Sequence, residues 1–76
     1  MLIVYSKKNC PACDQAKKYL STKHVDFSEV KIDEIPDARD FLLSRGHRSV
    51  PQIYKDDKLF VGSVAELISL PEQCLS

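Results

Sequence analysis

The sequence of 76 residues lacks a net charge, a long apolar run, an internal repeat and a low-complexity tract. Its 11 basic and 11 acidic side chains cancel with both histidines neutral, which argues against non-specific attraction to nucleic acid or to an anionic membrane. No apolar run approaches the roughly 20 residues that a membrane-spanning helix needs, and the first residues do not resemble a signal peptide. We therefore expect a cytoplasmic protein that acts without nucleic acid or a membrane.

The chain is also too short for a second domain, because globular domains usually need about 50 to 200 residues. Hydrophobic residues make up 43% of the chain and charged residues 29%, which is typical of a folded protein and excludes wholesale disorder. No linker interrupts the sequence. We therefore expect a single domain over residues 1–76, and a monomer, since no large apolar stripe is left over.

Apolar periodicity and turn residues predict an α/β chain with the element order β-α-β-α-β-β-α. Pro11 suits the first position of a helix, where its missing N–H is not needed. Gly46 is placed to end the second helix, and Ser63 with Glu66 has the spacing of a capping box before the last helix. Helices on both faces of a four-stranded mixed sheet would bury the apolar stripes. The predicted strands are 2–5, 26–32, 52–55 and 58–61, with a hairpin turn at 56–57, and the predicted helices run from 11 to about 23, from about 36 to 46, and from 63 to 71.

The three cysteines are unevenly placed: Cys10 and Cys13 open the first predicted helix, and Cys74 stands alone near the end. Residues three apart on a helix share one face, so their α-carbons fall within the roughly 4.4–6.8 Å window of a disulfide. In a reducing cytosol such a close pair is more often reactive or metal-binding than structural. We expect Cys74 to be a bystander thiol.

The two paired cysteines should differ in reactivity. Unpaired backbone N–H groups and the positive end of the helix dipole favour a thiolate at Cys10. Lys7 and Lys8 add positive potential, whereas Asp14 opposes it. We predict that Cys10 is the more exposed, nucleophilic cysteine and that Cys13 is the shielded, resolving one. Thiol–disulfide exchange then proceeds through a mixed disulfide on Cys10 and needs no bound cofactor, but another reductant must restore the dithiol.

A metal site is the first alternative, because half of a zinc site has the same cysteine spacing. The other obvious donors, His24, His47 and Cys74, are scattered and not paired at metal-ligand spacing. The position of the cysteine pair inside a β-α-β pattern favours redox chemistry, and we expect no bound metal. A metal or iron–sulfur carrier that uses Cys10 with an external thiol stays an alternative, as does a non-catalytic binding module.

Three separated motifs carry a resemblance to a known family. They are Tyr5-Ser6-Lys7 before Cys10-Pro11-Ala12-Cys13, then Val50-Pro51-Gln52, then Gly62 before the last helix. In this order they resemble a small glutaredoxin of the thioredoxin fold over nearly the whole chain. The middle of the chain resembles one branch, the NrdH redoxins, which are glutaredoxin-like hydrogen donors of ribonucleotide reductase. The residues that carry this second resemblance are Asp26-Phe27, Ile32-Asp33, Ile35-Pro36, Gly46 and Arg48.

The resemblance implies a thiol–disulfide oxidoreductase that reduces protein or glutathione mixed disulfides, with ribonucleotide reductase as a candidate substrate. Its reductant would be glutathione, or thioredoxin reductase with NADPH. The resemblance also implies that Val50-Pro51 is a cis peptide facing the active cysteines, with the Val50 backbone free to pair with a substrate chain. Pro11-Ala12 is the usual central pair of neither branch, so the choice of reductant stays open.

The implied substrate-binding or glutathione-binding residues are Lys7, Ala12, Val50, Pro51, Gly62, Ser63 and Val64. A lysine at the place of Lys7 helps glutaredoxins hold the glycine carboxylate of glutathione. Ser63 stands where those proteins usually have a second glycine, and Ala65 stands where they have an aspartate. Ala12 replaces their common aromatic residue. Capping the last helix is therefore an equally good account of Ser63.

Other charged residues receive a simpler interpretation. Lys17, Lys18 and Lys23 are read as a solvated helix face and not as a docking patch. Arg48, near Pro51, is read as a surface charge, although the NrdH resemblance also allows an anion contact.

Overall fold

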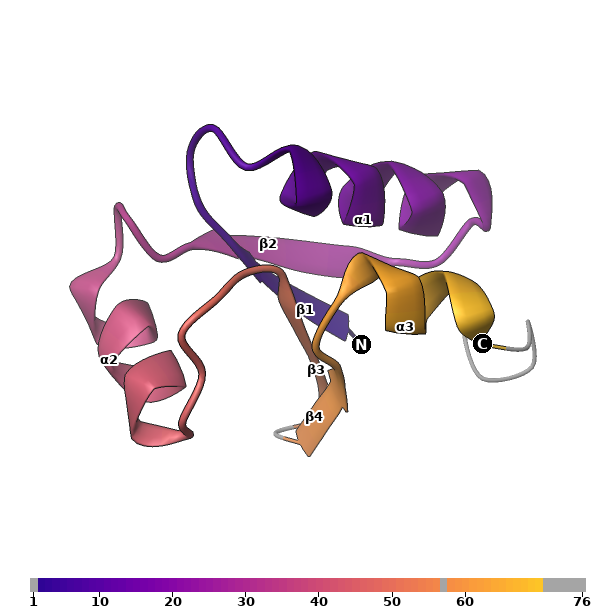
Figure 1. Ribbon diagram of the computed structural model, residues 1–76. Coiled ribbons are helices and arrows are strands. Elements are labelled where there is room, and N and C mark those ends of the chain that lie inside the picture. The colour runs from indigo at the N-terminus through magenta and orange to yellow at the C-terminus, as the bar shows by residue number, and fades with distance from the viewer. Residues whose placement is uncertain (1, 57, 71–76) are drawn as a thin grey trace.

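The computed structural model describes residues 2–56 and 58–70, and its elements follow the predicted order β-α-β-α-β-β-α (Figure 1). The second strand is slightly shorter than predicted, and the start of each helix is where the sequence indicates. The hairpin residue 57, the predicted helix end at 71 and Cys74 lie outside the described residues. The strands are β1 (Leu2–Ser6), β2 (Phe27–Lys31), β3 (Gln52–Lys55) and β4 (Lys58–Val61), and the helices are α1 (Pro11–Thr22), α2 (Pro36–Ser44) and α3 (Val64–Ser69).

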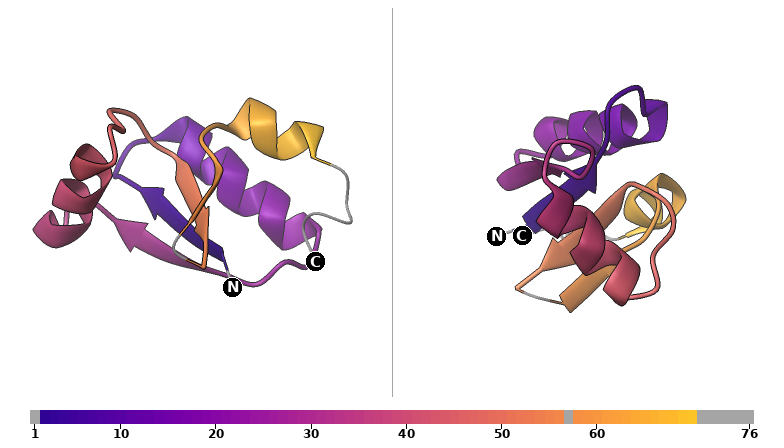
Figure 2. Two further views of the ribbon diagram at one scale, coloured as in Figure 1. Left: turned by 90° about the horizontal axis from the view of Figure 1, so that it is seen from below. Right: turned by 90° about the vertical axis from the view of Figure 1, so that its left-hand side faces the viewer.

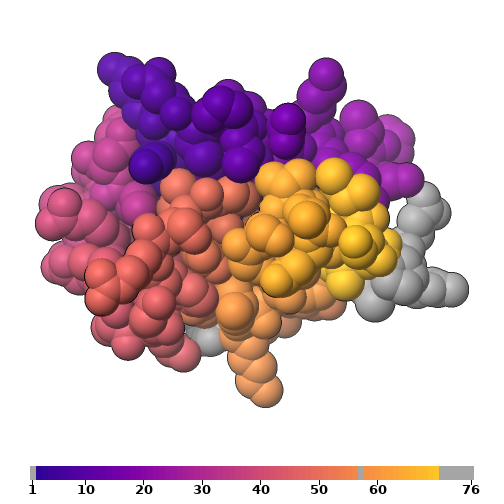
Figure 3. All heavy atoms as spheres, viewed as in Figure 1, coloured from indigo at the N-terminus to yellow at the C-terminus, as the bar shows by residue number. Residues whose placement is uncertain are grey.

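The four strands form one mixed sheet in the order β2-β1-β3-β4. β1 is parallel to β2 and antiparallel to β3, which is antiparallel to β4. Helices α1 and α3 lie together over one face of the sheet, and α2 lies on the other side (Figures 1 and 2). The space-filling view shows α3 packed directly against α1 (Figure 3). The predicted arrangement, with helices on both faces of a mixed sheet, is thereby confirmed.

The core lies between the sheet and the α1–α3 pair. Alternate residues of a strand point to opposite faces, so Leu2 and Val4 are buried on the face that α1 and α3 cover. Leu20 from α1 and Leu67 from α3 are fully buried against them. The core cluster consists of Leu2, Val4, Ala16, Leu20, Ile53, Val61 and Leu67. Through Ala16 and Leu20 this core holds α1, which carries the cysteines at its N-terminus, against the sheet.

An aromatic cluster joins α2 to the opposite face. Tyr5 of β1 and Tyr54 of β3 each contact the Phe41 ring of α2, with ring centroids 5.7 and 5.3 Å apart. The buried Tyr54 hydroxyl lies 2.8 Å from His47 Nε2, so its polar tip has the hydrogen-bond partner that burial requires. The cluster therefore fixes both α2 and the beginning of the loop that follows it.

Gly46 ends the second helix, as predicted. It adopts a φ of +82°, in the left-handed region that glycine enters without steric cost. The His47 N–H donates to Leu42 O at 2.9 Å, and the Gly46 N–H donates to Leu43 O at 3.0 Å. These two bonds form a Schellman motif, which satisfies carbonyls at the helix end and turns the chain toward Val50.

Candidate active site

Cys10 and Cys13 are joined by a disulfide at the N-terminus of α1. Cys10 is the N-cap residue and Pro11 follows it in the first turn, as the sequence predicts. The α-carbons of the two cysteines are 5.2 Å apart, inside the window for disulfides. One helical turn therefore brings the sulfurs together without any other change of fold.

The two sulfurs have different surroundings. Cys10 is 8% exposed and Cys13 is 1% exposed, so the predicted order of exposure is confirmed. The Cys13 N–H donates to Cys10 Sγ at 3.1 Å. This N–H is one of the unpaired donors of the first helical turn, and a charged acceptor strengthens such a bond. The arrangement therefore favours negative charge on Cys10 in the reduced protein.

The Val50–Pro51 peptide is cis, as the resemblance implies. Cys10 Sγ lies 4.0 Å from Val50 O, so residues far apart in sequence meet at the disulfide. Pro51 is buried, whereas Val50 is only partly buried. The partly buried Val50 thus lies with its carbonyl beside the more exposed of the two sulfurs.

Side chains at the start of α3 accept hydrogen bonds from the backbone N–H groups of the same turn. Ser63 Oγ accepts a hydrogen bond from the Glu66 N–H at 3.2 Å. The Glu66 carboxylate in turn accepts one from the Gly62 N–H at 3.1 Å. The Ser63 side of the predicted capping box is therefore present. Its other side differs, because the Glu66 carboxylate accepts the N–H of Gly62, one residue before the N-cap, and not that of Ser63. Val64 is half-buried against the core.

Gly62 has a packing reason to be glycine. A Cβ atom at this position would lie 3.1 Å from Oε1 of the buried Gln52, which follows Pro51 directly. Gln52 Nε2 donates to Ser49 O at 2.9 Å, while its Oε1 has no partner within the described residues. Through Gln52, the turn before α3 contacts the same loop that presents Val50 to Cys10.

A polar cluster beside the cysteine helix was missed by the sequence interpretation. Lys17 of α1, read as a solvated residue, lies with its Nζ 2.6 Å from Glu29 Oε2 on β2. The buried Ser6 hydroxyl donates to the same Glu29 oxygen at 2.7 Å. Hydrogen bonding between the pair raises the pKa of Lys17 and lowers the pKa of Glu29. No short-range pattern relates these residues, so no sequence signal could have found the cluster.

The metal-site alternative rests on donors that the described part of the chain does not bring together. Within residues 2–56 and 58–70, no group of three or more His, Cys, Asp or Glu side chains could hold a metal ion. His24 follows α1, whereas His47 follows α2 and is bonded to Tyr54. Over the same residues, no helix has the length and apolar character needed to cross a membrane.

Comparisons with known proteins agree with this geometry. The glutaredoxin family model matches residues 2–60. The chain is 44% identical over 62 residues to the glutaredoxin-like protein NrdH of Lactococcus lactis, an alignment that covers 82% of this chain and 86% of the relative. It is 38% identical over 68 residues to glutaredoxin 3 of Escherichia coli, covering 88% of this chain and 81% of that one.

The structure of an NrdH-redoxin from Escherichia coli matches with a TM-score of 0.75 at 23% identity, over 92% of this chain and 97% of that one. This likeness confirms the thioredoxin-like fold that the sequence motifs imply. The family match spans most of the chain and includes the cysteine pair at the N-terminus of α1. The chain therefore belongs to the glutaredoxin family of thiol–disulfide oxidoreductases.

Proposed function

We propose that this protein is a dithiol electron carrier that accepts electrons from thioredoxin reductase and delivers them to a disulfide of ribonucleotide reductase. It acts as a single-domain monomer in the cytoplasm, and nothing in its cycle requires nucleic acid or a membrane. The relatives named NrdH support this choice of branch. The Escherichia coli NrdH-redoxin, whose fold this chain shares, is described as having a thioredoxin-like activity profile.

The observation that carries the proposal is the carboxylate at the start of α3. Glutathione-dependent members hold the γ-glutamyl end of glutathione at this turn, and that end bears a carboxylate. Here the Glu66 carboxylate already accepts the Gly62 N–H, and Ala65 replaces the usual aspartate. The carboxylate of glutathione would find the Gly62 N–H already occupied, and it would be repelled by the negative charge of Glu66. Both effects oppose the binding of glutathione. Ser63 serves the cap.

The catalytic cycle uses the two cysteines in turn. The Cys10 thiolate attacks a substrate disulfide, so that a mixed disulfide forms and one substrate sulfur leaves as a thiolate that takes a proton. The Cys13 thiolate then attacks Cys10 Sγ, which breaks the mixed disulfide and releases the second substrate thiol. Two electrons pass to the substrate and the Cys10–Cys13 disulfide forms. Thioredoxin reductase returns the pair to dithiol with electrons from NADPH.

The surrounding residues position the substrate chain. The carbonyl oxygen of Val50 lies 4.0 Å from Cys10 Sγ. An extended substrate chain pairs with the Val50 backbone there, as an added strand does at the edge of a sheet. Pro51 holds this backbone toward the cysteines. Ala12 is small and leaves the approach to the disulfide open where other members have an aromatic side chain. Lys7 adds positive charge beside the thiolate.

A glutathione-dependent carrier is the second candidate. The 38% identity to glutaredoxin 3 of Escherichia coli favours it, as does the lysine at position 7. In that case the segment 62–64 would bind glutathione, and the hydrogen bond from the Gly62 N–H to the Glu66 carboxylate would have to break.

Coupled NADPH oxidation with a small disulfide separates the candidates. One arm contains glutathione with glutathione reductase, and the other contains thioredoxin reductase alone. We expect turnover only with thioredoxin reductase. Turnover only with glutathione would replace the proposal with the second candidate, and silence in both arms would return the metal carrier to consideration. The variant Cys10→Ser serves as the blank in each arm.

A further inference from the structure

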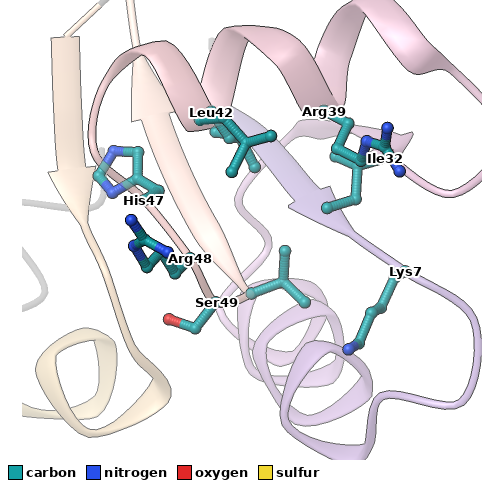
Figure 4. A pocket seen from close by; sticks show the side chains of 9 residues that line it. Lys7, Ile32, Arg39, Leu42, His47, Arg48 and Ser49 are labelled. Atoms are coloured by element: carbon teal, nitrogen blue, oxygen red, sulfur yellow. The ribbon is translucent and has the colours of Figure 1, made fainter.

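A hollow of about 240 Å³ adjoins the active site on the side of α2. Figure 4 shows Lys7 and Arg39 on one side of it, His47 and Arg48 on the other, and Leu42 between them. Val50, whose carbonyl lies 4.0 Å from Cys10 Sγ, belongs to both the hollow and the cysteine site. The residues that line the hollow are Lys7, Ile32, Arg39, Leu42, Leu43, His47, Arg48, Ser49 and Val50.

The rim of the hollow is positively charged although the protein as a whole has no net charge. Lys7, Arg39 and Arg48 come from three different segments, and all three line the hollow. None of the nine lining residues is acidic. Within the part of the chain that the structure describes, none of these three cations forms an ion pair. The hollow therefore presents three cations that have no ion-pair partner among the described residues to whatever enters it.

The floor of the hollow is apolar. Ile32, Leu42 and Val50 contribute to it, and the neighbouring Leu43 is 54% exposed, which is high for so large an apolar side chain. A simple inorganic anion would gain nothing from this surface. A peptide that carries acidic side chains and an apolar side chain would satisfy both the rim and the floor.

We propose that this hollow docks an acidic segment of the substrate protein, next to the disulfide that is reduced. The inference rests on the dithiol function proposed above. An extended chain advances about 3.3 Å per residue, so a segment paired with the Val50 backbone reaches the hollow within a few residues of its reacting cysteine. Lys7, Arg39 and Arg48 then select substrates by the charge that flanks the cysteine.

The test compares three synthetic peptides that contain the same disulfide and the same flanking leucine. Their neighbouring positions are glutamate in the first peptide, glutamine in the second and lysine in the third. The full-length protein is reduced with dithiothreitol and desalted, so the identity of the physiological reductase does not matter. The rate constant of a single turnover is measured by thiol trapping and mass spectrometry.

We expect the wild-type protein to reduce the glutamate peptide fastest and the lysine peptide slowest. Arg39→Gln and Arg48→Gln should each lower the ratio of the glutamate to the glutamine rate constant about two- to fivefold, as expected of exposed ion pairs. Added salt should lower the same ratio. Lys58→Gln removes an equal charge at the start of β4, away from the hollow, and should keep the ratio unchanged.

Equal rates for the three peptides, or an equal effect of Lys58→Gln, would overturn the docking proposal while leaving the dithiol function intact. Glutathione disulfide is included as a fourth substrate. If its reduction falls with Arg39→Gln and Arg48→Gln as much as reduction of the glutamate peptide does, the hollow is a glutathione site and the peptide proposal is wrong. If the wild type reduces none of the four, the dithiol function itself fails.

Discussion

Three features of its immediate surroundings support the proposed role of Cys10 as the nucleophile. It is the more exposed of the two sulfurs, it accepts the Cys13 N–H, and it faces the Val50 carbonyl. Cys13, at 1% exposure, is shielded from a substrate disulfide and lies within bonding reach of Cys10 Sγ. The proposed division of labour between a nucleophilic and a resolving thiol thus has its physical basis in burial at the first turn of one helix.

At the scale of these residues, Cys13→Ser should accumulate a mixed disulfide between Cys10 and the substrate, because the second attack is lost. Cys10→Ser should form no such adduct and should reduce no disulfide. Intact-mass spectrometry after mixing with a disulfide peptide distinguishes the two. An adduct on Cys13 of Cys10→Ser, at the wild-type rate, would reverse the assignment.

Glu66 gives a second prediction at the same scale. Glu66→Gln keeps an acceptor for the Gly62 N–H but removes the charge, so the cap is preserved. Because the carboxylate opposes glutathione in our proposal, this variant should gain glutathione-coupled turnover, which the wild type lacks, and should leave the thioredoxin reductase rate unchanged. Glu34→Gln removes an exposed carboxylate elsewhere and is the control. No rise with Glu66→Gln would remove charge repulsion as the basis of reductant choice.

At the scale of elements, the cysteine helix is attached to the sheet by more than its apolar face. Lys17 of α1 reaches Glu29 of the edge strand β2, and Ser6 at the end of β1 bonds the same carboxylate. Local signals predicted the element starts, since Pro11 and the Ser63–Glu66 cap act over a few residues. The Lys17–Glu29 pair depends on the parallel crossover, and no local pattern records that.

The pair predicts a pH dependence of stability. The pKa of Glu29 is lowered in the folded protein, so its contribution is present above the usual glutamate range and is lost as the pH falls through the folded value. The pKa of Lys17 is raised, so its contribution is present at neutral pH and is lost only as strongly alkaline pH passes the folded value.

Glu29→Gln should therefore lower the free energy of unfolding at pH 7 by about 0.5–1 kcal/mol, the range for partly exposed ion pairs. The difference from wild type should vanish in strong acid, where both proteins carry a neutral group. Urea unfolding at pH 7 and at a series of decreasing acidic pH values measures it. Glu34→Gln, at an exposed position, is expected to show almost no change, and an equal loss in both variants would contradict this account.

At the scale of the whole molecule, the hollow beside Val50 collects cations from the loop after β1, from α2 and from the loop before β3. Two of these three cations were considered from the sequence: Lys7 as a glutathione contact and Arg48 as a surface charge. The sequence interpretation missed Arg39, which sits on an ordinary amphipathic helix and becomes part of a site only when α2 is packed on the sheet. The segments that line the hollow are far apart in the sequence and come together only in the tertiary structure. Sequence motifs therefore indicated only some of its residues.

Oxidation should leave this molecule almost unchanged in shape. In the disulfide form the cysteine α-carbons are 5.2 Å apart, a spacing that one helix turn provides without the bond. Amide chemical shifts in reduced and oxidised protein should therefore differ around residues 7–14 and 49–52 and should agree over α2 and β4. Two-dimensional ¹H–¹⁵N spectra of the two forms test this, and widespread shifts would indicate a redox-driven rearrangement instead.

If the helix turn keeps its shape in both redox states, as we predict, a kinetic consequence follows. The oxidised protein then presents almost the same surface to its partner as the reduced protein does. The two forms therefore compete for the same docking position. Electron flux through the partner would then follow the ratio of reduced to oxidised carrier and not the amount of reduced carrier alone. Adding more protein without more reductase capacity would slow the partner by product inhibition.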